Sequence, residues 1–152
     1  MKITYKGDYA IRAILDLAYR FKSGEIVALA DICSRQNIPE KYLEQIMLVL
    51  KKGGYVDSKR GIGGGFFLKK SPGELTLGDV IRYVDGPLEP TAGIKNENMI
   101  LQVNNEDQKA FEEVWVEVTQ AIADVVDRVT FADIMQRAEE LRKKSAEFNY
   151  II

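Results

Sequence analysis

A glycine-rich segment, Arg60–Leu68, holds the residues whose types and spacing most directly suggest binding chemistry. It reads Arg-Gly-Ile-Gly-Gly-Gly-Phe-Phe-Leu. Its glycines permit a tight chain reversal and a close approach of backbone N–H groups to phosphate. Lys59 and Arg60 place positive charge next to Gly61, and an arginine at such a tip can enter a narrow minor groove. We interpret the segment as the tip of a β-wing that contacts DNA, and an ordinary hairpin turn is the alternative.

Two other kinds of glycine-rich site do not fit this segment. A P-loop would continue with Gly-Lys and then Ser or Thr, and this sequence does not. The dinucleotide-binding pattern requires a different glycine spacing and a following helix, whereas a strand is predicted to follow these glycines. Nucleotide binding of either kind is therefore not expected.

A second set of polar residues falls in the first two turns of a helix predicted to begin near Pro39. The set consists of Glu40, Lys41, Tyr42, Glu44 and Gln45. Glutamine can pair with adenine, lysine with guanine or phosphate, and glutamate with the amino group of cytosine. Tyrosine offers a hydroxyl group to phosphate and a ring to a thymine methyl group. These residues are candidates for reading base edges, and a solvated helix face is the alternative.

Hydrophobic spacing indicates the elements that must position these residues. The predicted elements are helices over residues 8–22, 28–36 and 39–52, strands over 55–58 and 66–69, and a short helix over 76–84. The second and third helices, joined by a tight turn, form a helix-turn-helix candidate. In such a motif the start of the second helix meets base edges.

The C-terminal half carries a heptad pattern that follows an irregular segment at residues 86–106. Its apolar residues are spaced by 4, 3, 4, 3 and 4, which is typical of a coiled-coil seam. They are Phe111, Trp115, Val118, Ile122, Val125 and Val129. We predict a helix over residues 107–129 that packs against its twin in a homodimer. The alternative is packing across the winged domain of the same chain.

One more helix and an apolar end are predicted after the heptad pattern. Thr130 and Asp133 have capping-box spacing, and the helix is expected to run to Lys144. The final residues are Tyr150, Ile151 and Ile152, whereas unanchored ends are usually polar. Capture of this end by a partner's pocket is one interpretation, and packing on the chain's own dimer is the other.

The composition excludes several classes of function. The chain has no histidine and one cysteine, Cys33, which excludes His-based catalysis, most transition-metal sites and an internal disulfide. We therefore expect no enzyme activity. No apolar run reaches the ~20 residues that cross a bilayer. The N-terminus has no apolar stretch typical of a signal peptide, so a cytoplasmic location is expected.

The charge is divided unevenly along the chain. Residues 1–70 carry 13 Lys and Arg against 7 Asp and Glu, whereas residues 71–152 carry 8 against 16. A basic N-terminal half suits an anionic polymer such as DNA, and an acidic C-terminal half would be repelled by it. The division agrees with a DNA-binding role for the first half, and a chance distribution of surface charge is the alternative.

Four motifs, in order along the chain, resemble the Rrf-type (Rrf two) family of bacterial repressors. They are Lys6-Gly7-x-Tyr9-Ala10, Leu29-Ala30-x-Ile32, Tyr42-Leu43-Glu44-Gln45 and Arg60-Gly61-x-Gly63-Gly64-Gly65. The resemblance implies a homodimer that binds a palindromic operator through a winged helix-turn-helix. It implies DNA contacts from Tyr42, Gln45 and Arg60 and an influence of Glu44 on operator choice, and we include Lys6 among the candidate contacts. Pro39 and Lys41 depart from the serines of cluster-binding members, which leaves the operator sequence open.

The resemblance also bears on cofactors and on signal input. Cluster-binding members carry three cysteines before the dimer helix, and this chain has none from Pro90 to Gln108. Because an iron–sulfur cluster needs thiolate or imidazole ligands, we expect no cofactor or metal. The chain then looks most like the cysteine-free branch, typified by the cysteine-metabolism repressor CymR. That branch implies cysteine synthase as the partner of the apolar end. The alternative inputs are a redox reaction at Cys33 and a small ligand near the linker.

Together these observations predict a mainly α fold. It consists of a winged helix-turn-helix with a two-stranded β-wing and a long C-terminal dimerisation helix. The predicted division is a DNA-binding domain at 1–85, a linker loop at 86–106, and a C-terminal unit at 107–152 with the dimerisation helix, final helix and tail. A protein-interaction adaptor without DNA binding is the alternative class, and it would leave the basic half without a role.

Overall fold

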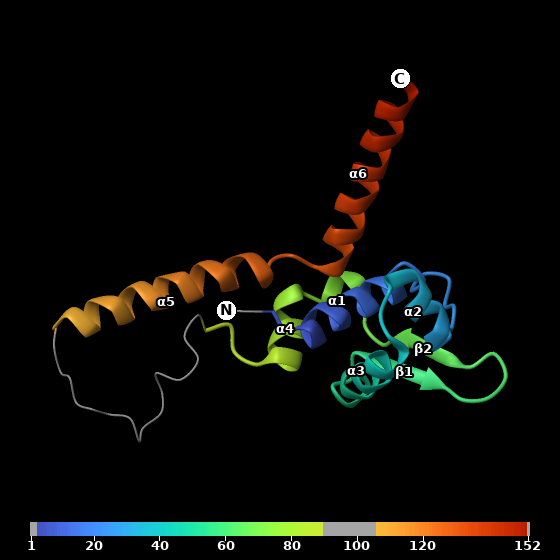
Figure 1. Ribbon diagram of the computed structural model, residues 1–152, viewed down its shortest axis with the longest axis horizontal. Coiled ribbons are helices and arrows are strands. Elements are labelled where there is room, and N and C mark those ends of the chain that lie inside the picture. Colours follow the sequence, from blue (N-terminus) through green and yellow to red (C-terminus); the bar gives the residue numbers. More distant parts are fainter. Residues whose placement is uncertain (1–2, 90–105, 152) are drawn as a thin grey trace.

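The computed structural model describes residues 3–89 and 106–151, and helices dominate both ranges (Figure 1). The elements are α1 (Tyr5–Ala18), α2 (Leu29–Gln36), α3 (Glu40–Lys52), β1 (Val56–Lys59), β2 (Gly65–Leu68), the 3-10 helix η1 (Pro72–Glu74), α4 (Leu77–Asp85), α5 (Glu106–Val126) and α6 (Phe131–Ile151). The first four helices and the hairpin form one packed body, from which α5 and α6 extend in different directions. This arrangement confirms the predicted mainly α fold with a two-stranded wing.

The turn between α2 and α3 is set by two residues with special backbone preferences. Asn37 adopts a left-handed conformation, with φ 51° and ψ 52°, which asparagine tolerates better than most residues. Pro39 is the N-cap of α3 in an extended conformation. At its other end α3 carries Lys51 and Lys52, whose charges favour the negative end of a helix. The local sequence therefore specifies both the turn and the length of α3.

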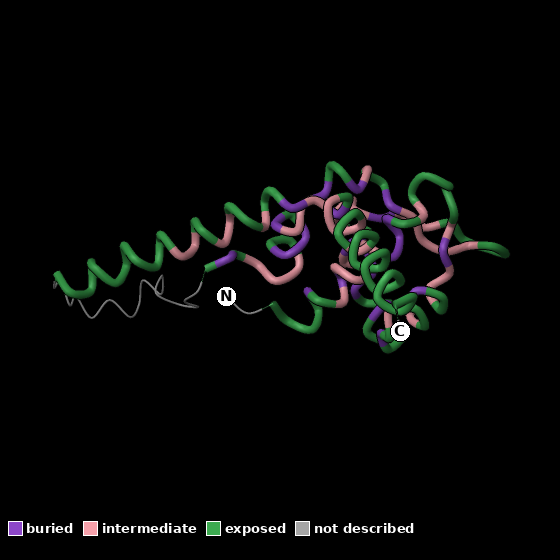
Figure 2. The backbone as a smooth tube through the Cα atoms, turned by 90° about the horizontal axis from the view of Figure 1, so that it is seen from above, coloured by how far each residue is buried: buried purple, intermediate pink, exposed green. Residues whose placement is uncertain are grey.

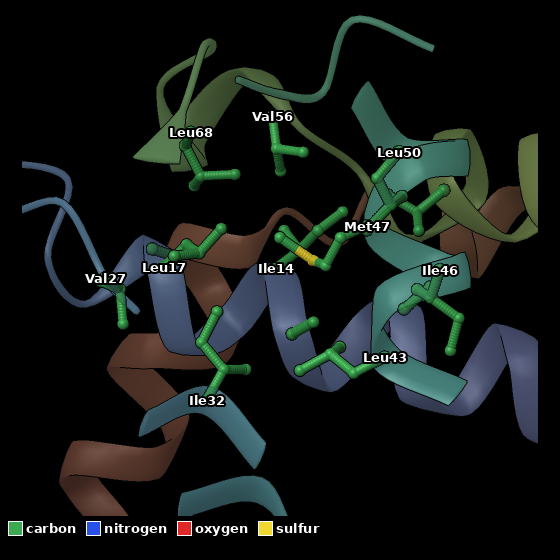
Figure 3. Packing of buried hydrophobic residues seen from close by; sticks show 14 of the residues in the cluster. Ile14, Leu17, Val27, Ile32, Leu43, Ile46, Met47, Leu50, Val56 and Leu68 are labelled. Atoms are coloured by element: carbon green, nitrogen blue, oxygen red, sulfur yellow. The ribbon is translucent and has the colours of Figure 1, made fainter. Parts of the chain in front are cut away.

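The core of the packed body lies between α1 and α3 and beneath the wing (Figure 3). Ile14 and Leu17 of α1 meet Leu43, Met47 and Leu50 of α3, and none of these side chains is more than 2% exposed. The buried side chains of α3 are those of the apolar stripe in its sequence. The opposite face of α3 is consequently left free of the core.

The wing is a hairpin in which Val56 lies opposite Leu68 and Lys59 lies opposite Gly65. Val27 extends it through a β-bridge to Phe66. The Val27 N–H donates to the Phe66 carbonyl at 2.9 Å, and the Phe66 N–H donates to the Val27 carbonyl at 2.8 Å. The sequence prediction did not include this bridge, because a single paired residue produces no alternating pattern.

Helices α5 and α6 meet at a junction that belongs to the packed body. The Leu77 N–H donates to the Val129 carbonyl and the Phe131 N–H donates to the Leu75 carbonyl, each at 3.0 Å. Phe131 is fully buried and joins the main core. Away from the junction, most of α5 and α6 is exposed (Figure 2).

Three predicted helices differ from the structure by more than one residue at an end. The first helix occupies Tyr5–Ala18 rather than 8–22, because Thr4 caps its start by accepting the Gly7 N–H at 3.2 Å. The long helix ends at Val126 rather than at residue 129. The last helix continues to Ile151 rather than ending at Lys144, since no glycine or proline interrupts residues 145–151.

The predicted domain division stays a prediction. Residues 90–105, which make up most of the predicted linker loop, lie outside the described residues. The burial of Phe131 shows that the beginning of α6 packs with the helix-turn-helix, although the prediction assigned it to the C-terminal unit.

Candidate nucleic-acid interface

The free face of α3 carries the polar residues predicted to read base edges. Glu40, Lys41, Tyr42, Glu44 and Gln45 are all exposed. The Tyr42 side chain keeps 62% of its surface accessible, although aromatic residues tend toward burial. The structure thus brings the whole predicted set onto the exposed side of one helix.

The tip of the wing is the second exposed polar surface. Lys59, Arg60 and Gly61 are exposed, and the loop reaches beyond the paired strands (Figure 1). Gly61 and Gly63 have φ values of 95° and 71°, in the left-handed region that favours glycine. The Gly64 N–H closes the loop by donating to the Gly61 carbonyl at 3.0 Å. The glycines therefore permit the tight chain reversal that was predicted from the sequence.

Polar contacts fix the base of the wing to the end of α3. Lys51 Nζ lies 3.4 Å from Asp57 Oδ1 and donates to Ser58 Oγ at 2.5 Å. The Ser58 N–H, followed by Lys51, holds the pKa of the Asp57 carboxyl below its usual value. These contacts join the base of the wing to the C-terminal end of α3.

The start of α1 lies beside α3 and extends its polar face. An open groove between the two helices is lined by Thr4, Tyr5, Lys6, Tyr9, Tyr42, Gln45 and Ile46. The groove places Lys6 of α1 near Tyr42 and Gln45 of α3. All three were predicted as DNA contacts, from separate segments of the sequence. The sequence reasoning missed Tyr5 and Tyr9, and the signal that could have found them is their spacing of four residues on one helix face.

Asp85 at the end of α4 holds the start of α1 in this place. It accepts from the Thr4 N–H at 2.9 Å and from the Thr4 hydroxyl group at 2.5 Å. Gly7 makes the approach possible, because a Cβ at that position would collide with the Asp85 carboxylate. The glycine of the Lys6-Gly7 motif therefore has a packing role.

An ion pair with a buried carboxylate connects α1 to the first helix of the helix-turn-helix. Asp16 is 1% exposed and accepts from Arg35 Nε and from a terminal nitrogen of the same guanidinium, each at 2.9 Å. Gln36 Nε2 donates to the same carboxylate at 3.2 Å. The hydrogen bonds to Asp16 raise the pKa of Arg35. The sequence reasoning missed this pair, because a buried aspartate has no distinctive sequence pattern.

The predicted heptad residues largely share an exposed side of α5. Phe111 and Trp115 are 64% and 38% exposed. Further along the helix, Val118, Ala121, Ile122, Val125 and Val126 line an open apolar groove. Val129 is the exception and a correction to the predicted seam. It follows the end of α5 and is only 5% exposed, because it is packed at the junction with α4.

The predicted partner-binding tail is helical as far as the structure describes it. Tyr150 and Ile151 belong to the last turn of α6 and are 96% and 84% exposed. Ile152 lies outside the described residues. Neither side chain packs on the chain's own core.

Cys33 is partly buried against the core rather than presented on the surface. Burial, followed by the charge of Glu40, raises the pKa of its thiol group. Among residues 3–89 and 106–151 no group of three or more cysteine, aspartate or glutamate side chains is arranged to hold a metal ion. In the same ranges, no helix is long and apolar enough to cross a membrane.

Comparison with known proteins identifies the family. A family model described as "Rrf2: Iron-dependent Transcriptional regulator" matches residues 3–137, nearly the whole chain. This chain belongs to the Rrf2 family. As an Rrf2 protein it is a DNA-binding transcriptional regulator with a winged helix-turn-helix, and its relatives with assigned roles are transcriptional regulators.

Three relatives show how far the similarity extends. CymR of Bacillus subtilis is 33% identical over 134 residues, which cover 88% of this Rrf2 chain and 89% of CymR. IscR of Pectobacterium carotovorum is 36% identical over 141 residues, covering 93% and 83% of the two chains. The solved structure of CymR, the global cysteine regulator of B. subtilis, matches with a TM-score of 0.75 at 31% identity, covering 90% of this chain and 98% of CymR. IscR of T. potens matches with a TM-score of 0.73 at 35% identity, covering 93% and 90%.

Proposed function

We propose that this Rrf2 protein is a homodimeric repressor that binds a palindromic operator. The observation that carries the proposal is the exposed face of α3, which joins Lys6 across the groove and is fixed to the wing through Lys51. In this arrangement α3 enters the major groove, as the second helix of a helix-turn-helix does. The wing tip then reaches the flanking backbone. A regulator of this kind acts where the DNA is, which supports a cytoplasmic location.

Within this proposal the individual side chains have different tasks. Tyr42, Glu44 and Gln45 face base edges, whose donors and acceptors distinguish one sequence from another. The basic residues Lys6, Lys41, Lys59 and Arg60 contact phosphate or sugar, and the backbone N–H of Gly61 approaches a phosphate. Contacts of the second kind set register and affinity without reading sequence.

Dimerisation through α5 is the second part of the proposal. A helix of 21 residues that has no buried residue and an apolar groove along one side is suited to packing against another helix. A twofold dimer presents two α3 helices, and its operator then has two inverted half-sites. Phe111, Trp115, Val118, Ile122 and Val125 form the proposed seam.

The residues of this chain do not fit an iron–sulfur cluster, although the family description names iron. Cys33 is the only cysteine in the sequence, there is no histidine, and the Cys33 side chain lies against the core. Cluster ligation requires several thiolate or imidazole ligands. We therefore propose regulation without a cluster, and protein purified under anaerobic conditions is expected to be colourless. An air-sensitive visible absorption band would contradict this.

The signal that controls the repressor is proposed to be cysteine synthase, which would link operator binding to sulfur and cysteine metabolism. Support comes from the similarity to CymR and from the exposed apolar side chains Phe148, Tyr150 and Ile151 at the end of α6. Operator affinity is expected to change when the enzyme is added to the intact chain and not when it is added to a form lacking Ile151 and Ile152. An equal change for both forms would remove the tail from the mechanism.

The decisive experiment for DNA recognition begins with duplexes selected from a random-sequence pool by the wild-type protein. The selected duplexes are expected to contain inverted repeats with half-site centres about one helical turn, ~34–36 Å, apart. Fluorescence anisotropy should show affinity falling steeply as salt rises, because phosphate contacts release counterions. Expression of a reporter behind a selected duplex should fall when the protein is present. A pool that yields no enriched sequence would contradict the proposal.

A further inference from the structure

Three tyrosines form a row that runs from the start of α1 to the exposed face of α3. The ring centroids of Tyr5 and Tyr9 are 6.3 Å apart, and those of Tyr9 and Tyr42 are 6.5 Å apart. The rings are inclined by 42° and 52°. Both distances lie within the range in which aromatic pairs attract each other. Tyr9 is thus the link between α1 and the Tyr42 ring.

The Tyr9 ring is itself held by Arg12, one turn further along α1. The guanidinium carbon of Arg12 lies 4.9 Å from the Tyr9 ring centroid, close enough for a cation–π interaction. One terminal nitrogen of Arg12 donates to the Gln36 carbonyl at 2.6 Å, and the other lies 2.9 Å from Asp8 Oδ2. Arg12 is therefore anchored both to its own helix and to the last residue of α2.

The rings of Tyr9 and Tyr42 differ in conformational freedom. Tyr9 is half-buried and packs against the core, whereas the Tyr42 side chain is 62% exposed. An exposed tyrosine on a helix surface ordinarily samples several rotamers. Contact with a ring that is held in place favours one of them. The contact leaves the greater part of Tyr42 available to a ligand.

We propose that Tyr9, held by Arg12, is a positioning residue that orients Tyr42 for DNA recognition. The inference rests on the proposed contact between Tyr42 and DNA. Tyr9 acts through Tyr42, by reducing the conformational entropy that Tyr42 loses when DNA binds. Its contribution should therefore appear in sequence-specific binding and disappear when the Tyr42 ring is removed.

The principal variants are Tyr9→Leu, which removes the ring, and Tyr9→Phe, which keeps it. The probes are a duplex selected by the wild-type protein and an unrelated duplex of equal length. Tyr9→Leu is expected to reduce the ratio of specific to nonspecific affinity roughly two- to tenfold, the range that corresponds to one aromatic pair. The dependence of affinity on salt should stay the same, because no phosphate contact is lost. Tyr9→Phe should retain the wild-type ratio.

Tyr19→Leu is the matched control. Tyr19 lies at the other end of α1 and also has an arginine over its ring, with the guanidinium carbon of Arg142 at 5.3 Å. Tyr19→Leu should leave the ratio of specific to nonspecific affinity unchanged. Thermal unfolding and titration of active protein verify that each variant is folded. If Tyr9→Leu does not fold, Tyr9→Met takes its place, because methionine fills a similar volume without a ring.

A double-mutant cycle with Tyr42→Leu separates this inference from the proposed contact between Tyr42 and DNA on which it rests. If Tyr9 acts through Tyr42, Tyr9→Leu should have little further effect in the Tyr42→Leu protein. Equal effects in both backgrounds would overturn the positioning role. A loss on Tyr42→Leu with none on Tyr9→Leu would also overturn it while leaving the Tyr42–DNA contact intact. If Tyr42→Leu itself binds normally, the proposed contact between Tyr42 and DNA is wrong.

Discussion

Arg60 has an exposed side chain at the beginning of the wing tip, next to a glycine with a left-handed backbone. The neighbouring glycines have no side chains that would keep a polyanion at a distance. An arginine in such a loop can approach a phosphate or a narrow minor groove without moving the packed body. At the scale of single residues, this position offers the simplest test of the wing.

Arg60→Ala is expected to weaken binding to the selected duplex and to make the slope of log affinity against log salt shallower by about one unit, the change for one lost phosphate contact. The measurement is fluorescence anisotropy over a range of salt concentrations. Lys143→Ala is the control, because it removes one positive charge from an exposed position on α6, away from α3 and the wing. An unchanged slope for Arg60→Ala would mean that Arg60 does not contact the DNA backbone.

Gly65 illustrates a residue whose importance comes from its neighbour. A Cβ at Gly65 would collide with the backbone of Val27, where the bridge to Phe66 leaves no space. Gly65→Ala is therefore expected to lower the free energy of unfolding by about 1–3 kcal/mol, as overpacking does. Urea unfolding provides the measurement. Gly73→Ala should be close to neutral, because only the Ser71 side chain comes near the added Cβ, at 3.7 Å. Equal stabilities for the two variants would contradict the packing argument.

At the scale of elements, α5 has more apolar surface than its contacts within the chain can cover. Ile122 lies near the middle of the groove formed with Val118 and Val125. In a monomer these side chains remain in water, whereas a second α5 would bury them. The hydrophobic gain from that burial is the physical reason to expect a dimer.

Ile122→Glu is expected to shift the protein from dimer to monomer, because it places a charge in the apolar seam. Sedimentation equilibrium measures the mass directly. Gln120→Glu adds the same charge at an exposed position outside the groove and should leave the dimer intact. A persistent dimer for Ile122→Glu would place the interface on another surface.

At the scale of the whole molecule, an ion pair between Asp127, the residue that follows α5, and Arg82 of α4 adds to the contacts at the junction with the packed body. Two guanidinium nitrogens of Arg82 donate to the two carboxylate oxygens of Asp127, at 2.6 and 2.8 Å. Gly78 permits the contact, since a Cβ there would collide with Asp127. The hydrogen bonds from Arg82 hold the pKa of Asp127 below its usual value of 3.8. This ion pair therefore couples the end of α5 to α4.

The Arg82–Asp127 contact predicts a specific dependence of stability on pH. Because the folded-state pKa of Asp127 is depressed, its contribution is fully present above about pH 4 and is lost as the pH falls through the folded pKa. Asp127→Asn should remove this part of the acid sensitivity and lower stability at neutral pH by ~1 kcal/mol or less, since both side chains are partly exposed. Urea unfolding at several pH values tests this. Asp107→Asn, at the far end of α5, leaves the contact between Arg82 and Asp127 intact and is the control.

Much of the fold and part of the candidate site could be predicted from the sequence. The order of helices, the turn at Asn37 and Pro39 and the wing follow from hydrophobic period and from turn residues, which act over a few neighbouring positions. The polar set on α3 followed in the same way, because it alternates with the buried stripe. These features depend only on residues that are close together in the sequence.

Other features were decided only when distant segments packed together. Val129 fits the heptad spacing, yet it is buried at the junction with α4. The pairing of Asp16 with Arg35 and the approach of Tyr9 to Tyr42 join separate helices. Periodicity shows which face of an element is apolar, but it does not show which other element will cover that face. The sequence by itself thus determined the elements and their exposed chemistry, and the tertiary structure decided which side chains meet.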